Sequence, residues 1–216
     1  MSFFVEVFGE NACFTRPEMK VERVSYDVMT PSAARGLLEA IYWHPGLKYV
    51  IDRIYVMNPI RFTNIRRNEV KSVISKPPRK TLTDGISDKE LFINAREDIQ
   101  QRAAMILTDV HYVIEAHFVM TENAAESDNE GKFCDIIRRR LEKGQCYHHP
   151  YFGCREFPAH FKKWEGGKIE TVPDTRDLGF MLYDIDYSDS KNLQPQFFRA
   201  VLKNGVLDVR DCEVFK

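Results

Sequence analysis

The sequence predicts an α+β protein, and three patterns in its 216 residues support this. Residues 110–120 alternate apolar and polar side chains, which is typical of a half-buried strand. Residues 29–43 and 132–143 place apolar side chains at helical spacing instead. With the flanking strand-like segments, the order is strand, helix, strand, strand, helix, strand, followed by strands alone. This order predicts a ferredoxin-like βαββαβ domain with a small C-terminal antiparallel β-sheet domain.

The first three elements are expected between residues 3 and 62. The apolar run at residues 3–8 (FFVEVF) predicts a buried strand. Thr30 suits the N-cap of the first helix because its side chain can accept a backbone hydrogen bond, and Pro31 suits the first helical position. Residues 47–62 are rich in Tyr, Val and Ile and predict a long strand.

Residues 63–106 are expected to form a long basic insertion in the ferredoxin-like domain. They contain Pro77-Pro78 and the turn-forming pair Asp84-Gly85, and their hydrophobic periodicity is weak. These features indicate a long hairpin or a mobile loop rather than a second core.

The last third of the chain is expected to be β-structure. Four short strand-like segments occur, around Tyr151 and at residues 180–183, 197–202 and 206–209. Asn204-Gly205 joins the last two and predicts a tight hairpin turn. We therefore expect a ferredoxin-like domain at residues 1–157 and a β-sheet domain at residues 158–216.

Composition excludes several classes of protein. The chain is 44% hydrophobic and 29% charged, as globular proteins usually are. No apolar run approaches the roughly 20 residues that span a bilayer, and the N-terminus lacks the basic segment of a signal peptide. The five cysteines form no CxxC pair, which indicates reduced thiols in the cytosol. We expect a cytoplasmic protein with no membrane partner.

Basic residues are concentrated in two stretches, although the net charge is only −1. The first stretch holds seven cations: Arg61, Arg66, Arg67, Lys71, Lys76, Arg79 and Lys80. The second spans residues 132–163 and includes Arg138, Arg139 and Arg140. Segregated charge of this kind provides basic surface for a polyanion, although charge runs can also simply solvate a face.

The common catalytic and cofactor motifs are absent from the sequence. It contains no phosphate-binding loop, no dinucleotide fingerprint, no HExxH and no GxSxG. Cys146, His149, Cys154 and His160 could be arranged as a zinc set, but their spacing matches no standard ligand pattern. We expect no metal and no cofactor.

Tyr42 and Lys132 lie at expected helix ends and are candidate functional residues. Tyr42 follows the apolar stripe of the first helix, where a tyrosine could also simply cover the core. Lys132 lies at the start of the second helix, where the macrodipole disfavours a cation by a few tenths of a kcal/mol. A lysine there is a weak sign that an anion binds at this helix end.

Several long segments together resemble one family of proteins. They are VEVFGENACFTRPE, SYDVMTPSAARGLLEAIYWHP, DRIYVMNPI, TDVHYVIEAHFVM, DNEGKFCDIIRRRLEKGQCY and FGCREFPA. These segments, from Phe3 to Cys212, resemble the subtype I-C (Dvulg) CRISPR-associated endoribonucleases of the repeat-associated mysterious protein superfamily. The resemblance implies the same two-domain fold and the processing of precursor CRISPR RNA.

The resemblance also implies a catalytic group of a tyrosine, a lysine and an adjacent histidine. The first two positions are Tyr42 and Lys132, but Phe133 occupies the histidine position. Phenylalanine cannot transfer a proton, and three other histidines could supply one: His44, His148 and His149. A histidine introduced at Phe133 is expected to raise the rate, unless this ring packs in the core and its replacement destabilises the fold.

The implied function is metal-independent cleavage of the CRISPR repeat hairpin. The 2′-hydroxyl would attack the phosphate at the 3′ base of the stem, and the protein would keep the 5′ handle within a type I-C surveillance complex with other Cas subunits. The expected RNA contacts are Arg61, Arg66, Arg67, Lys71, Arg138, Arg139 and Arg140, and duplex DNA is a further candidate partner. Two alternatives are a non-cleaving subunit that caps the 5′ handle and a general nucleic-acid-binding module.

Overall fold

The computed structural model describes residues 2–19, 21–73, 83, 92–187 and 192–216. Two helices and ten strands are distinguished within these residues. The helices are α1 (Pro31–Ile41) and α3 (Glu130–Lys143). The strands are β1 (Phe3–Ala12), β2 (Arg23–Val24), β3 (Leu47–Val56), β4 (Phe62–Val70), β5 (Ile99–Met120), β6 (His160–Lys163), β7 (Arg176–Asp186), β8 (Gln194–Lys203), β9 (Val206–Asp208) and β10 (Val214–Phe215). The protein is therefore α+β, with a mostly antiparallel sheet.

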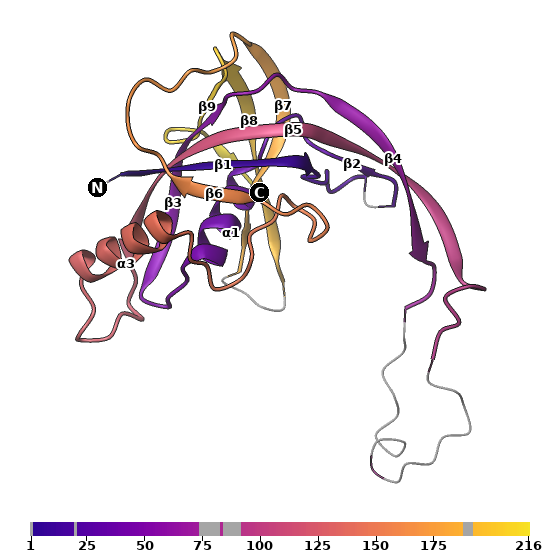
Figure 1. The fold of residues 1–216 in the computed structure, drawn as a ribbon, viewed down its shortest axis with the longest axis horizontal. Coiled ribbons are helices and arrows are strands. Elements are labelled where there is room, and N and C mark those ends of the chain that lie inside the picture. The colour runs from indigo at the N-terminus through magenta and orange to yellow at the C-terminus, as the bar shows by residue number, and fades with distance from the viewer. Residues whose placement is uncertain (1, 20, 74–82, 84–91, 188–191) are drawn as a thin grey trace.

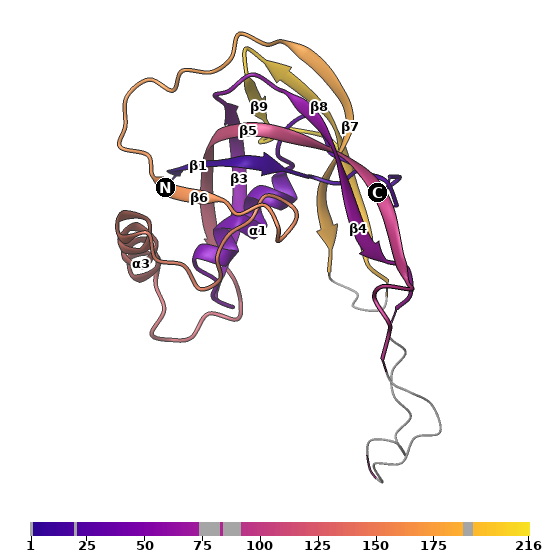
Figure 2. The same cartoon turned by 45° about the vertical axis from the view of Figure 1, so that its right-hand side comes forward.

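Both expected helices are present, and their ends follow the local sequence. Thr30 caps α1 by accepting a 3.1 Å hydrogen bond from the backbone N–H of Ala33, and Pro31 is the first helical residue. α3 ends at Lys143 and is capped by Gly144, whose left-handed backbone (φ 62°) costs a glycine little. The two helices lie on the same side of the sheet (Figures 1 and 2).

The central strands follow the order β6-β1-β5-β3, and each neighbouring pair is antiparallel. Val5 and Val7 of β1 are fully buried, as the short apolar run in the sequence predicts. The strand expected around Tyr151 is a wrong prediction, because that residue makes only an isolated bridge with Pro158. The strand that pairs with β1 is β6, which comes later in the chain.

The C-terminal strands continue the same sheet beyond β3. β9 pairs with β3, β8 pairs with both β7 and β9, and the predicted Asn204-Gly205 turn joins β8 to β9 with positive φ at both residues. β7 is also tied to α1, because the Arg35 guanidinium donates to both carboxylate oxygens of Asp184 at 2.7 and 3.0 Å.

The expected insertion contains a long hairpin, called here the arm: β4 and residues 99–107 of β5. β4 pairs with this part of β5 along its whole length, and the arm projects from the body of the molecule (Figures 1 and 2). β5 then continues through the strand expected at residues 110–120, with positive φ at Asp109 between the two parts. Residues Lys76, Pro77, Pro78, Arg79, Lys80, Asp84 and Gly85 lie outside the described residues.

Within the described residues, neither helix has the length and apolar character needed to cross a bilayer.

Candidate active site

Tyr42 lies where the chain leaves α1. Its backbone is extended (φ −149°, ψ 118°), while its N–H still donates to the Leu38 carbonyl at 2.9 Å. Its own carbonyl accepts a 2.8 Å hydrogen bond from the Tyr49 hydroxyl on β3. Tyr42 is only 8% exposed, so these contacts and its packing hold the ring in place at the helix end.

Lys132 lies in the first turn of α3. The Asn129 side chain caps the helix by accepting a 2.9 Å hydrogen bond from the Lys132 backbone N–H. The Lys132 ammonium donates to Asp128 Oδ1 at 2.6 Å, and Asp128 Oδ2 accepts from the Ala125 N–H at 2.9 Å. These contacts hold a cation at a helix end where the macrodipole disfavours one.

Asp128 is a site residue that the sequence patterns did not point to. Its side chain is only 2% exposed. The hydrogen bonds from Lys132 and from the Ala125 N–H lower the pKa of the Asp128 carboxyl, so it is ionised at neutral pH. The spacing of four residues to Lys132 is the signal that could have found it, because residues so spaced face each other at a helix start.

Arg140 and Phe133 of α3 connect the two helix ends. The Arg140 guanidinium donates to the Ile41 carbonyl and lies 5.0 Å from the centre of the Tyr42 ring, which is a cation–π contact. Phe133 is fully buried, and its ring centre lies 6.2 Å from that of Tyr42. The structure therefore brings α1 and α3 together at this point, with Phe133 packed inward as its place in the apolar stripe suggests.

The Tyr42 hydroxyl is a hydrogen-bond donor rather than a base at neutral pH. Burial raises its pKa, and the nearby cations Lys132 and Arg140 offset this only in part. Tyrosine already has a pKa of about 10 when unperturbed. The hydroxyl therefore keeps its proton and can donate it in a hydrogen bond to an oxygen of a bound phosphate.

Of the three candidate histidines, the structure brings His44 to this site. Its ring centre lies 5.0 Å from that of Phe133 and 6.4 Å from that of Tyr42. His148 and His149 are exposed, and His148 packs against the Tyr147 ring. Within the described chain, neither of these two imidazoles makes a hydrogen bond or ring contact with Tyr42 or Lys132.

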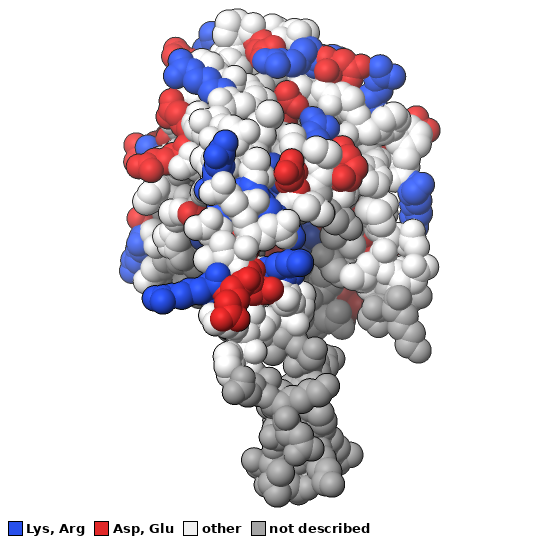
Figure 3. Space-filling model, turned by 90° about the vertical axis from the view of Figure 1, so that its right-hand side faces the viewer, with Lys and Arg blue, Asp and Glu red and all other residues white. Residues whose placement is uncertain are grey.

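The basic residues of the arm differ in whether they form ion pairs with acidic side chains. Arg67 forms ion pairs with Glu69, at 3.1 Å, and with Glu156. Arg66 and Lys71 are exposed and have no ion-pair partner among the described residues. Acidic side chains lie among the basic ones on the face from which the arm projects (Figure 3). Arg66 and Lys71 are therefore more available to phosphates than Arg67 is.

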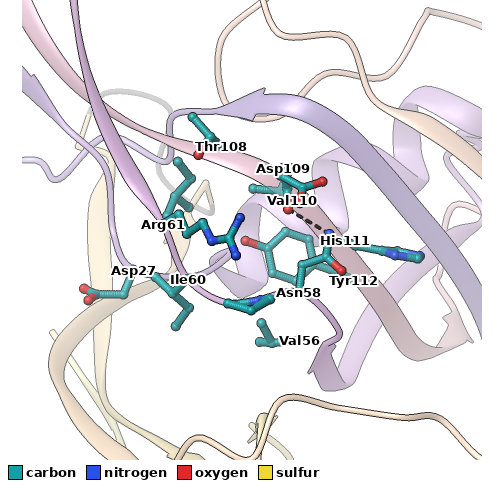
Figure 4. A pocket seen from close by; sticks show the side chains of 12 residues that line it. Asp27, Val56, Asn58, Ile60, Arg61, Thr108, Asp109, Val110, His111 and Tyr112 are labelled. Atoms are coloured by element: carbon teal, nitrogen blue, oxygen red, sulfur yellow. Dashed lines mark hydrogen bonds between the residues drawn. The ribbon is translucent and has the colours of Figure 1, made fainter.

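Arg61 lies just before the arm, beside a very small cavity of about 10 Å³. Figure 4 shows its guanidinium pointing toward the side chains of Asn58 and Tyr112, while Asn58 donates to the Asp109 carbonyl at 3.0 Å. A volume of this size holds about one water molecule. It is too small to be a ligand site, and Arg61 itself is exposed.

The three arginines of α3 have different surroundings. Arg138 pairs with Asp135 at 2.7 Å and is exposed, as is Arg139, whereas Arg140 belongs to the site around Tyr42. The arm and α3 lie on opposite sides of the body (Figures 1 and 2). Among the described residues, the arginines of α3 thus lie apart from those of the arm, and a basic surface shared with the rest of the insertion stays a prediction.

The cysteines and histidines considered for zinc belong to the described part of the chain. No group of three or more His, Cys, Asp or Glu side chains positioned to hold a metal occurs among the described residues.

Comparison with known proteins identifies the family of this chain. Residues 3–210 match the Cas5d family model, described as CRISPR-associated protein (Cas_Cas5). The chain is 50% identical over 211 residues to the CRISPR pre-crRNA endoribonuclease Cas5d of Mannheimia succiniciproducens, covering 95% of this chain and 93% of the relative. It is 39% identical over 225 residues to the protein of the same name from Thermus thermophilus, covering 95% and 90% of the two chains.

Solved structures share the fold at lower identity. A crystal structure of a CRISPR-associated protein matches with a TM-score of 0.71 and 24% identity, covering 100% of this chain and 97% of that chain. A chain of a CRISPR RNA-guided surveillance complex matches with a TM-score of 0.51 and 13% identity, covering 100% and 89%. On the family match and the two near-full-length relatives, this chain belongs to the Cas5d family of CRISPR-associated proteins.

Proposed function

We propose that this chain is a pre-crRNA endoribonuclease that binds the CRISPR repeat hairpin and cuts it at the 3′ base of the stem. Both curated relatives bear the name of this activity, and each covers 95% of the chain. The observation that carries the proposal is the approach of the ends of α1 and α3, where Arg140 lies 5.0 Å from the centre of the Tyr42 ring and the charge of Lys132 acts on the Tyr42 hydroxyl. A hydroxyl donor and an ammonium are what a scissile phosphate needs around it.

The RNA supplies its own nucleophile in this mechanism. The 2′ oxygen attacks the adjacent phosphorus, the bond to the 5′ oxygen breaks, and the products are a 2′,3′-cyclic phosphate and a 5′-hydroxyl end. Lys132 stabilises the negative charge that grows on the phosphoryl oxygens. Tyr42 donates a hydrogen bond from its hydroxyl to the same group and helps to orient it.

We infer a ferredoxin-like unit made of β1, α1, β3, β5, α3 and β6, with the arm inserted between β3 and the second half of β5. The strand order β6-β1-β5-β3, all antiparallel, supports this inference. The division into residues 1–157 and 158–216 stays a prediction, and β6 pairs with β1 across that boundary.

The partners that fit this function are the repeat RNA and the other Cas subunits of a type I-C surveillance complex. A chain of an RNA-guided surveillance complex shares the fold, which supports a place in such an assembly. We infer that the protein keeps the 5′ handle of the RNA after cleavage and acts in the cytoplasm.

Cleavage of the cognate repeat RNA is expected to continue in excess EDTA. The nucleophile is the 2′-hydroxyl of the RNA, and Lys132 supplies the positive charge at the phosphate, so no metal-bound hydroxide is needed. The measurement is single-turnover cleavage of labelled repeat RNA with and without the chelator. A rate that collapses in EDTA and returns with magnesium or zinc would refute metal independence. RNA binding without cleavage under any condition would favour the non-cleaving alternative.

The double variant Arg66→Ala, Lys71→Ala should weaken RNA binding and flatten its salt dependence. Each lost phosphate contact removes about 0.7 to 0.9 from the slope of log affinity against log salt. Arg67→Ala is the matched comparison, because Arg67 already pairs with Glu69 and Glu156; its slope should change less. An unchanged slope in the double variant would show that the arm does not contact RNA.

A further inference from the structure

His44 is a polar side chain of the site to which the mechanism above gives no role. It lies in the turn between α1 and β3, two residues after Tyr42, and its ring centre is 5.0 Å from that of Phe133. The Gly46 N–H donates a 3.0 Å hydrogen bond to His44 Nδ1. Because Nδ1 is the acceptor, the neutral ring carries its proton on Nε2.

The turn that holds His44 is closely packed. A Cβ atom at Gly46 would lie 2.8 Å from Ala124 Cα and 3.1 Å from His44 Nδ1, so only glycine fits here without a shift. The Gly46 carbonyl in turn accepts a 3.0 Å hydrogen bond from the Thr121 N–H. The imidazole therefore has a defined orientation before any RNA binds.

The free nitrogen of His44 is available to a ligand. The side chain is 30% exposed, and Nε2 has no hydrogen-bond partner in the described part of the chain. The charged and titratable groups around the ring are Asp128, whose Oδ2 lies 3.8 Å from Nδ1, the Tyr42 hydroxyl, and beyond them Lys132 and Arg140. Nε2 of His44 is thus an oriented N–H donor at the site in addition to the donors of Tyr42 and Lys132.

We propose that His44 donates a hydrogen bond from Nε2 to the 5′ oxygen of the scissile phosphate, a role that rests on the proposed function. As the bond between phosphorus and the 5′ oxygen breaks, that oxygen gains negative charge, and a preorganised donor stabilises it most at that moment. The 2′-hydroxyl proton passes to water, and the departing 5′ oxygen takes its proton from water. His44 ends the reaction unchanged, and Phe133, which has no donor, serves to support its ring.

The test compares two repeat RNAs that differ in one atom at the cleavage site. One carries the natural 5′ oxygen, and the other carries sulfur at the same bridging position. A thiolate leaves readily and accepts hydrogen bonds weakly, so it has little need of a donor. His44→Phe, which keeps a ring against Phe133, should slow the oxygen substrate about 10²–10³-fold and the sulfur substrate less than about threefold.

Two controls accompany this comparison. His148→Phe changes an exposed imidazole and keeps the backbone hydrogen bond from the His148 N–H to the Ala40 carbonyl, and it should leave both rates unchanged. His44→Gln places an amide N–H near the position of Nε2, and should recover at least about tenfold of the rate lost on the oxygen substrate in His44→Phe. The melting temperature and the RNA affinity of each variant show whether it is folded and binds substrate. If His44→Phe does not fold, the ratio of oxygen to sulfur rates in His44→Gln, compared with that of the unchanged protein, tests the role of His44.

Different results of these experiments would contradict the role of His44 and the proposed function. Equal slowing of both substrates, or no slowing of the oxygen substrate, would overturn the role of His44 at the leaving group. Lys132→Ala should slow both substrates alike, because it acts on the phosphoryl oxygens. Wild-type rates in both Lys132→Ala and Tyr42→Phe would instead reject the site itself, whatever His44 does.

Discussion

Lys132→Ala should slow single-turnover cleavage of the repeat RNA by about 10²–10³-fold, the typical effect of removing one donor from a developing oxyanion. RNA affinity should change by only a few fold. The ammonium interacts most strongly when negative charge has built up on the phosphoryl oxygens, so its loss falls mainly on the transition state. Tyr42→Phe keeps the ring against Phe133 and Arg140 and removes only the hydroxyl. Its rate should fall by about 10–10²-fold, since a hydrogen bond to a charged group contributes about 1.5–3 kcal/mol.

Lys143→Ala is the matched control for the lysine. Lys143 is an exposed residue at the other end of the same helix, so its removal changes net charge equally without touching the site. Full cleavage activity in Lys132→Ala would remove this lysine from the mechanism. An equal loss in both lysine variants would indicate a general electrostatic effect on RNA binding instead.

Phe133→His should destabilise the fold by about 2–4 kcal/mol and should not raise the cleavage rate. The ring is fully buried against Tyr42, His44 and Phe118, and replacing it loses packing and leaves imidazole nitrogens without partners. For a chain of this size the melting temperature should fall by about 5–15 °C. The structure thus favours packing over the alternative in which a histidine here adds a proton donor.

Thermal melts and single-turnover rates on the same samples test this prediction. Phe133→Leu is the control, because it keeps an apolar side chain and should lose less stability than the histidine variant. The rates are measured at a temperature at which all variants are folded. An unchanged melting temperature together with a faster rate near neutral pH would show that position 133 reaches the substrate after all.

The sequence by itself determined the two helices, the C-terminal hairpin turn and the candidates Tyr42 and Lys132. Thr30 and Pro31 predict the start of α1, and Asn204-Gly205 predicts the turn between β8 and β9. Both predictions succeed because helix caps and tight turns depend on a few neighbouring residues. Tyr42 and Lys132 could be singled out because each lies at a helix end, and the family resemblance connected them. Phe133 could be assigned to the core from its place in the apolar stripe of α3.

Only the tertiary structure decided which of the remaining candidates lie beside Tyr42 and Phe133. His44 and not His148 faces Phe133, Arg140 lies over Tyr42 rather than on a basic surface, and Arg67 is held by Glu69 and Glu156. The strand expected near Tyr151 is replaced by β6, because the edge of β1 is filled by a later segment. These outcomes depend on contacts between residues far apart in the chain, and the local patterns of caps, turns and periodicity contain no information about such contacts.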